Sequence, residues 1–182
     1  MKKLNTPLSI DEIDFRVQSI NKGGYATILA YKDARVDMNR LDEVYGVGFW
    51  QKKYDLINGN LFCSVGIYNK ELNQWVWLQD VGTESMTEKE KGQASDAFKR
   101  ACFNLGIGRE LYDYPVISIK LEANEFKIEQ FNNKDIVKPT FDFKLKEWKW
   151  FSQFTKDGKL NYLACKDTTG KVRFTYGTYI KE

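Results

Sequence analysis

The spacing of apolar residues predicts two helices in the first quarter of the chain. A capping box, Ser9 with Glu12, precedes residues 10–20, where we expect a short helix that ends at a glycine pair. Asp33 can cap a second helix that reaches residue 45 and ends at Gly46. Its apolar stripe recurs at helical spacing and comprises Ala34, Met38, Leu41 and Tyr45.

Shorter apolar runs predict strands. Residues 25–31 read as a buried strand or an extended segment. Residues 49–56 and 61–68 flank Asn58-Gly59, the strongest short hairpin signal. A looser turn leads into residues 74–81, where Trp75 and Trp77 share one face, because side chains alternate along a strand.

A long helix is expected after these strands. A second capping box, Ser85 with Glu88, precedes a helical pattern over residues 87–105, and Gly106 can end it. The order predicts an α+β fold in which an antiparallel β-meander packs on this long helix. Short helices precede this β-β-β-α core, and a small segment containing a β-hairpin follows it.

The pattern changes after Pro115. Residues 116–131 alternate in polarity and predict strands, whereas Lys138-Pro139 looks like a joint. We therefore divide the chain into a core at 1–138 and a C-terminal segment at 139–182, where a hairpin turn is expected at 167–170. Within that segment KLKEWKW interleaves lysine with tryptophan. Such a pattern suits base stacking, a buried tryptophan seam or a partner-binding face.

Composition narrows the chemistry. The chain has 182 residues, is 42% hydrophobic and carries a net charge of only +3, so a nucleic-acid site has to be a local patch. It has no histidine, the commonest general base and metal ligand, and its three cysteines lie far apart. We expect no catalytic residues, metal or cofactor, and no membrane segment. The odd cysteine count without a signal peptide fits the cytoplasm.

Two adjacent cations stand out on the long helix. At about 100° per residue from Ala94, Lys99 falls near 140°, Phe103 near 180° and Arg100 near 240°, opposite the apolar face. Two cations around an aromatic ring suit a single-stranded nucleic-acid backbone. The alternative is an ordinary solvated helix surface, with Phe103 covered by the C-terminal segment.

Further cations are weaker candidates. Arg109 follows the Gly106-Ile107-Gly108 turn, which places it near the helix end; alternatively it is a surface arginine after a glycine cap. Lys52 and Lys53 lie on the first hairpin strand and Lys70 at the next turn. They can make outer DNA contacts or simply keep the hairpin soluble.

The order of these motifs resembles the Rad-fifty-two-type single-strand annealing proteins, especially short bacteriophage recombination proteins. The resemblance covers residues 30–114: Ala34-Arg35-Val36 opening a helix, Tyr45 to Trp50, two hairpin turns, and Lys-Arg-Ala followed by Leu-Gly-Ile-Gly. It implies that Arg35, Lys99 and Arg100 bind DNA. Animal members carry another arginine where this chain has Phe103, and Arg109 is our candidate for the missing charge.

The resemblance also implies a function. We expect residues 1–138 to form a DNA-binding, oligomerising core that holds single-stranded DNA in the basic groove of a homo-oligomeric ring. It would anneal complementary strands in recombination and repair without ATP, as a non-enzyme, with a phage or host single-stranded DNA-binding protein as a candidate partner. The alternatives are a single-stranded nucleic-acid-binding protein that does not anneal and, more remotely, a carboxylate-metal nuclease.

Overall fold

The computed structural model describes residues 3–83 and 89–181 and divides into two compact units. The first unit is Met1–Leu8 with Lys32–Arg109, and the second unit is Ser9–Tyr31 with Glu110–Glu182. Helices and antiparallel strands are both present, so the predicted α+β class is confirmed. The division of function at residue 138 stays a prediction.

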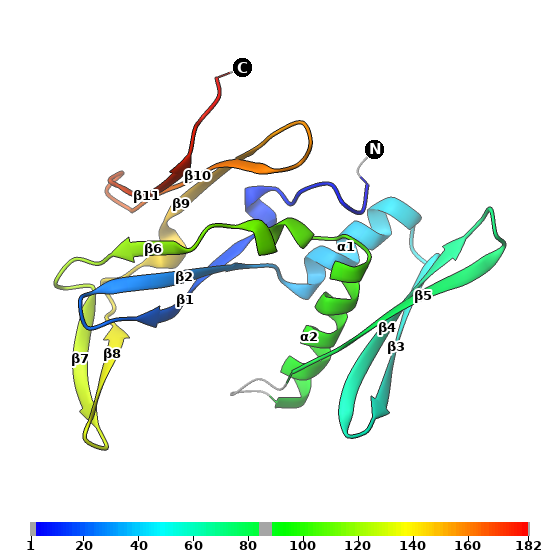
Figure 1. Ribbon diagram of the computed structural model, residues 1–182, viewed down its shortest axis with the longest axis horizontal. Coiled ribbons are helices and arrows are strands. Elements are labelled where there is room, and N and C mark those ends of the chain that lie inside the picture. Colours follow the sequence, from blue (N-terminus) through cyan, green and yellow to red (C-terminus); the bar gives the residue numbers. More distant parts are fainter. Residues whose placement is uncertain (1–2, 84–88, 182) are drawn as a thin grey trace. The chain divides into compact units, whose positions relative to one another are not determined.

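The first unit packs a three-stranded sheet against helices (Figure 1). Its elements are α1 (Ala34–Tyr45), β3 (Trp50–Ile57), β4 (Asn60–Asn69), β5 (Gln74–Val81) and α2 (Lys89–Asn104). The strands are antiparallel in the order β3-β4-β5, and α2 lies against β4 and β5. Asn58 and Gly59 both have positive φ, 51° and 77°, which confirms the tight hairpin predicted between β3 and β4.

Small residues let α2 approach the sheet closely. The core of this unit joins Leu41 of α1 and two residues of β4 to the predicted apolar face of α2. Its buried members are Leu41, Cys63, Val65, Ala97, Phe98, Ala101, Cys102 and Ile107. At the end of β5, a Cβ atom on Gly82 would lie 2.2 Å from the carbonyl oxygen of Gln93, so only glycine fits. Gly82 therefore allows the end of β5 to lie in close contact with α2.

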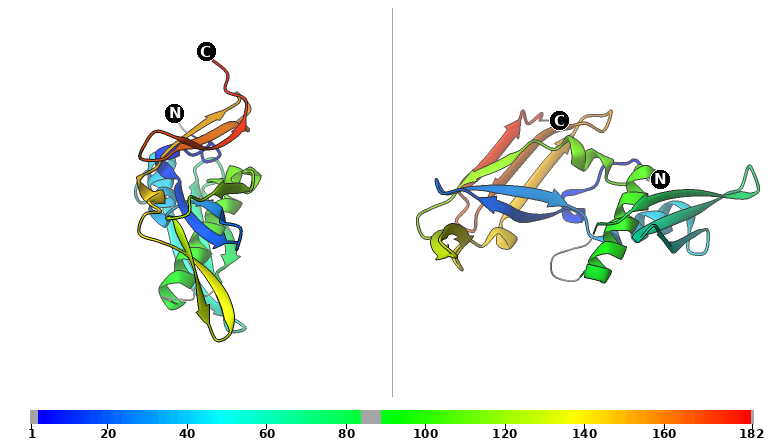
Figure 2. Two further views of the ribbon diagram at one scale, coloured as in Figure 1. Left: turned by 90° about the vertical axis from the view of Figure 1, so that its left-hand side faces the viewer. Right: turned by 60° about the horizontal axis from the view of Figure 1, so that its bottom comes forward.

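The second unit is built mainly from strands (Figure 2). Its strands are β1 (Asp14–Ile20), β2 (Tyr25–Tyr31), β6 (Ile117–Lys120), β7 (Phe126–Phe131), β8 (Lys134–Pro139), β9 (Lys149–Phe154), β10 (Leu160–Lys166) and β11 (Val172–Gly177). They form sheets β1-β2-β6 and β11-β10-β9 and a β7-β8 hairpin. Short 3-10 helices are η1 (Ile10–Glu12), η2 (Arg109–Asp113) and η3 (Leu145–Glu147). The hairpin predicted around residues 167–170 joins β10 to β11.

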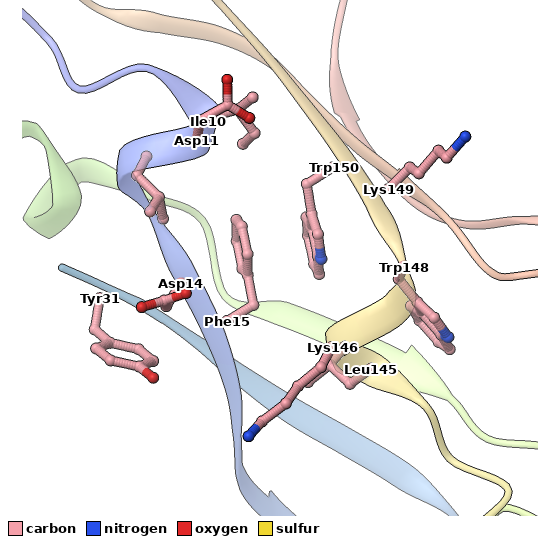
Figure 3. Close-up of a pocket in the computed structure, with 11 residues that line it drawn as sticks. Ile10, Asp11, Asp14, Phe15, Tyr31, Leu145, Lys146, Trp148, Lys149 and Trp150 are labelled. Atoms are coloured by element: carbon pink, nitrogen blue, oxygen red, sulfur yellow. The ribbon is translucent and has the colours of Figure 1, made fainter. Parts of the chain in front are cut away.

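The helix predicted over residues 10–20 is wrong. The capping contact forms, since the Glu12 carboxylate accepts from the Ser9 backbone N–H at 2.8 Å, but it starts only the single turn of η1. The chain then enters β1, because Phe15 and Val17 alternate with polar residues and pack into a core. Phe15 stacks on Trp150 of β9, with ring centroids 3.6 Å apart beside a cleft of about 690 Å³ (Figure 3). The glycine pair is the β1-β2 turn.

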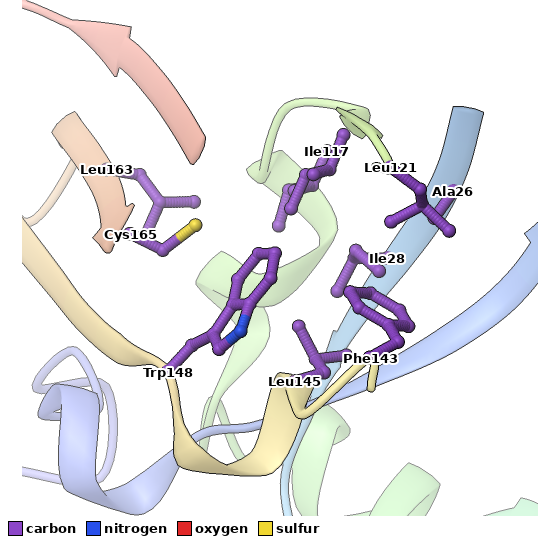
Figure 4. Packing of buried hydrophobic residues seen from close by; sticks show 10 residues of the cluster. Ala26, Ile28, Ile117, Leu121, Phe143, Leu145, Trp148, Leu163 and Cys165 are labelled. Atoms are coloured by element: carbon purple, nitrogen blue, oxygen red, sulfur yellow. The ribbon is translucent and has the colours of Figure 1, made fainter. Parts of the chain in front are cut away.

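The core of the second unit lies between its two three-stranded sheets (Figure 4). Ile28 of β2 and Ile117 of β6 face Leu163 and Cys165 of β10, with Trp148 among them. The KLKEWKW segment thus buries Trp148, half-buries Trp150 and exposes its lysines, which fits the seam interpretation. The predicted capping box at 85–88 lies outside the described residues.

Candidate nucleic-acid interface

Helix α2 carries the two central cations on the sides that flank its buried face. Lys99 is half-buried, and in the described part of the chain no hydrogen bond or ion pair engages its ammonium group. It lies close enough to the N-terminus of α1 for its charge to lower the pKa of Asp33. A lysine on a packed helix without a salt-bridge partner is available to neutralise an external anion.

Arg35 shares this neighbourhood. The Asp33 carboxylate caps α1 by accepting from the backbone N–H of Arg35 at 2.8 Å, and it accepts from the Arg35 Nε at the same distance. These hydrogen bonds hold the pKa of Asp33 below its usual value, with a smaller contribution from Lys99. The Arg35 side chain is 80% exposed, so the pair lies at the surface. Arg35 thus contacts the Asp33 carboxylate directly, whereas Lys99 acts on it only through its charge.

Arg100 faces the sheet instead. Its Nε lies 3.3 Å from the Oδ1 of Asp80 on β5, and its side chain is 40% exposed. The Asn104 side-chain amide donates to the other oxygen of the same carboxylate at 3.3 Å. Lys99 and Arg100 are adjacent in sequence yet have different neighbours, α1 and β5, as their separation around the helix predicts. The spacing of residues along α2 did not identify Asp80 as the partner of Arg100, because Asp80 lies on another element.

Phe103 lies outside the core cluster but is not open. Its ring is half-buried and carries the Lys32 ammonium 4.2 Å from the centroid. Lys32 is 2% exposed, forms a buried ion pair with Asp37, and donates to the Ile107 carbonyl at 2.8 Å. Burial raises the pKa of Asp37 to about 6, although the charges of Lys32 and Lys99 oppose this shift. Lys32 thus covers the ring, and it is a structural cation.

Arg109 caps the C-terminus of α2. Its guanidinium donates to the carbonyl of Phe103 at 2.8 and 3.1 Å and to that of Asn104 at 3.0 Å. Gly106 and Gly108, with φ of +98° and +70°, turn the chain back so that this contact forms. The residue stays exposed, so it adds positive charge at the helix end while it satisfies free carbonyls.

The strand lysines divide between the two faces of the sheet. Lys52 pairs in register with buried Val65, and its ammonium lies 4.5 Å from the ring centroid of Phe98, so it is on the side of α2. Lys53 faces the opposite side, 5.1 Å from the ring of Trp77. Lys70 lies at the β4-β5 turn over Phe49. Only Lys52 shares the helix side with Arg100.

The residues that the structure describes give this surface a cationic character. Within residues 3–83 and 89–181, no cluster of three or more cysteine, aspartate or glutamate residues could hold a metal ion. No helix in those residues is long and apolar enough to cross a bilayer. What the geometry offers is a surface of cations around α2: Lys99 and Arg35 on one flank, Arg100 and Lys52 toward the sheet, and Arg109 at the end.

Comparison with known proteins shows to which family the chain belongs. The family model described as "Rad52/22 family double-strand break repair protein" matches residues 1–129. The chain belongs to the Rad52/22 family. The family match includes all of α1, β3, β4, β5 and α2, and hence every candidate residue named above.

A curated relative is similar over a shorter region. The chain is 32% identical over 117 residues to the "Single-stranded DNA-binding protein DdrA" of Deinococcus radiodurans. The aligned region covers 63% of this Rad52/22-family chain and 55% of the relative, so the chain spans about half of that protein's length.

Proposed function

We propose that this protein binds single-stranded DNA by its phosphate backbone at the cations around α2. The observation that carries the proposal is that Lys99, a half-buried residue of α2, has no salt-bridge partner within the described residues. Its charge also reaches Asp33, the carboxylate that Arg35 of α1 contacts. Neutralising phosphates releases counterions, which favours binding regardless of sequence. Membership of the Rad52/22 family supports this assignment.

The same arrangement supports annealing. We assign to residues 1–138 a core that assembles into a homo-oligomeric ring and holds the backbone with its bases free to pair. Neutralised phosphates no longer repel a second strand, and many weak contacts in a ring add through avidity. Since pairing itself is downhill, the step needs neither ATP nor a catalytic group. The role is the pairing of complementary strands in homologous recombination and repair, in the manner of phage recombination proteins.

The remaining candidate cations have different places in this proposal. Arg109 and Lys52 are placed to lengthen the cationic surface, whereas Lys53 and Lys70 would contact an outer DNA strand.

Binding without annealing is the second candidate function, favoured by the name of the Deinococcus relative, which states only single-stranded DNA binding. A nuclease is tested directly by adding magnesium or manganese and looking for cleavage.

Salt-dependent binding tests the proposal. For a single-stranded oligodeoxynucleotide, Lys99→Ala and Arg100→Ala should each weaken binding and reduce the slope of log K against log salt by about 0.7, the value for one phosphate contact. Lys134→Ala, which removes the same charge from an exposed position on β8, is the control. Unchanged slopes in folded Lys99 and Arg100 variants would contradict a phosphate role.

A further inference from the structure

Figure 2 shows the sheet formed by β11, β10 and β9. The outer face of this sheet has a composition that the fold does not explain. Leu163 and Cys165 point inward to the core, so the residues between and beside them point outward. Figure 3 shows the same alternation on β9, where Trp150 and Lys149 project to opposite sides of the strand. The outward set is Lys149, Phe151, Tyr162 and Lys166, joined by Val172 and Tyr179 around a groove of about 460 Å³.

Two lysines oppose each other on this face. Lys149 and Lys166 are direct partners in the β9-β10 register, both are exposed, and like charges placed this way destabilise a sheet. Some exposed lysines of the unit have acidic partners, as Lys22 has Asp135 and Lys171 has Glu122, and others, such as Lys134, stand alone among the described residues without a like charge opposite them. Within the described residues, no ion pair is formed by Lys149 or Lys166, and no carboxylate lines the groove. The ammonium groups of Lys149 and Lys166 therefore have no neutralising carboxylate among the residues that line the groove.

Aromatic rings lie beside the two lysines. Phe151, Tyr162 and Tyr179 meet edge to face, with ring centroids 5.6 to 6.0 Å apart. Phe151 is 46% and Tyr179 49% exposed, so part of each ring is open to a ligand. The larger cleft of the same unit, in Figure 3, differs because Asp11 and Asp14 line it together with Lys146; Lys149 borders both the cleft and the groove. Cations and open rings without acids are the features that bind phosphates and stack bases.

We propose that the outer face of the β11-β10-β9 sheet is a second contact for single-stranded DNA. A phosphate lies between Lys149 and Lys166 and relieves their repulsion, while a neighbouring base stacks on Phe151, Tyr162 or Tyr179. The proposal shares its ligand with the proposed function, but it rests on residues beyond the 1–129 family match and on none of the cations around α2. It gives the lysine- and aromatic-rich C-terminal segment a role in holding the strand.

A charge-matched pair of variants in the full chain tests this site. Lys149→Gln with Lys166→Gln should reduce the salt slope for a single-stranded oligodeoxynucleotide by about 0.7 to 1.4, one or two phosphate contacts. It should also keep or raise the melting temperature, since a repulsion is removed. Lys156→Gln with Lys159→Gln makes the same charge change near the β9-β10 turn, away from the groove lining, and should leave the slope nearly unchanged. Equal effects of the two pairs would overturn the proposal.

Photocrosslinking separates this site from the one around α2. An oligonucleotide carrying bromodeoxyuridine should crosslink to peptides that contain Phe151, Tyr162 or Tyr179, and these crosslinks should persist when Lys99 and Arg100 are changed to alanine. Loss of affinity only in the α2 variants, without crosslinks on the sheet, would overturn the second site and leave the proposed function standing. Crosslinks on the sheet together with unchanged affinity in the α2 variants would support the second site and contradict the proposed role of the cations around α2.

Discussion

Removing the Asp80 carboxylate should strengthen DNA binding, because Asp80 competes with phosphate for Arg100. The Arg100 Nε lies 3.3 Å from the Asp80 Oδ1, and the two side chains are 40% and 23% exposed. A pair this exposed is worth about 0.2–1 kcal/mol. If Arg100 gives up this contact when it binds DNA, Asp80→Asn should tighten binding by about 1.4-fold to about 5-fold.

The substitution should cost little stability. Asparagine retains an oxygen that can accept from the Val81 backbone N–H, which Asp80 Oδ1 now does at 2.7 Å. Loss of at most about 1 kcal/mol would lower the melting temperature by no more than about 4 °C in a chain of this size. A small thermal shift together with tighter binding distinguishes release of Arg100 from a damaged fold.

Fluorescence anisotropy with a labelled oligonucleotide measures the gain, and two controls interpret it. Asp96→Asn makes the same charge change on α2, at a carboxylate that accepts from Thr83 and not from a site cation, and should give a smaller gain. Combining Asp80→Asn with Arg100→Ala should abolish the gain, because the two residues act as a pair. An equal gain in the Arg100→Ala background would refute the reasoning.

Three other outcomes are expected. Lys32→Met should lower the free energy of unfolding by about 3–5 kcal/mol in urea titrations, because it leaves Asp37 buried without its partner; a stable variant would contradict the pairing. Phe103→Ala should lower the melting temperature but keep the salt slope of DNA binding, since Lys32 already covers the ring; a reduced slope would count against this. A hydrogen bond from Thr169 is the main cause that lowers the pKa of Asp167 to about 2, against about 3.9 when unfolded, so this carboxyl stabilises above pH 4. Circular dichroism should show that stabilisation being lost as the pH falls from about 4 to about 2, and Asp167→Asn should flatten this dependence.

Local signals predicted much of the first unit. The Asp33 cap, the stripe of α1 and the Asn58-Gly59 turn are all formed, because each depends on neighbours within a few residues. The buried face of α2 also followed from helical spacing alone. The helix predicted over residues 10–20 was wrong because a capping box determines the conformation of only the first helical turn. The long-range partner β2, which itself pairs with β6, decides that this segment is a strand.

The sequence predicted which cations lie at the candidate site, but it did not predict which residues they contact. Spacing placed Lys99 and Arg100 on the side of α2 opposite its apolar face, and in the structure both residues lie outside the core cluster and are partly exposed. It could not show that Asp80 engages Arg100, that Lys32 is buried over Phe103, or that Arg109 donates to helix carbonyls. Each of these contacts joins separate elements or depends on a backbone turn. Binding by these residues stays a prediction until it is measured.

Strand annealing is the most direct test of the central claim. Two complementary fluorescent oligonucleotides are mixed with the full chain without ATP or divalent metal, and the rate of pairing is followed by energy transfer. We expect the wild-type protein to accelerate pairing, and the Lys99→Ala, Arg100→Ala double variant to lose most of that acceleration while remaining folded. Pairing no faster than that of the free strands at saturating wild-type protein would contradict the account.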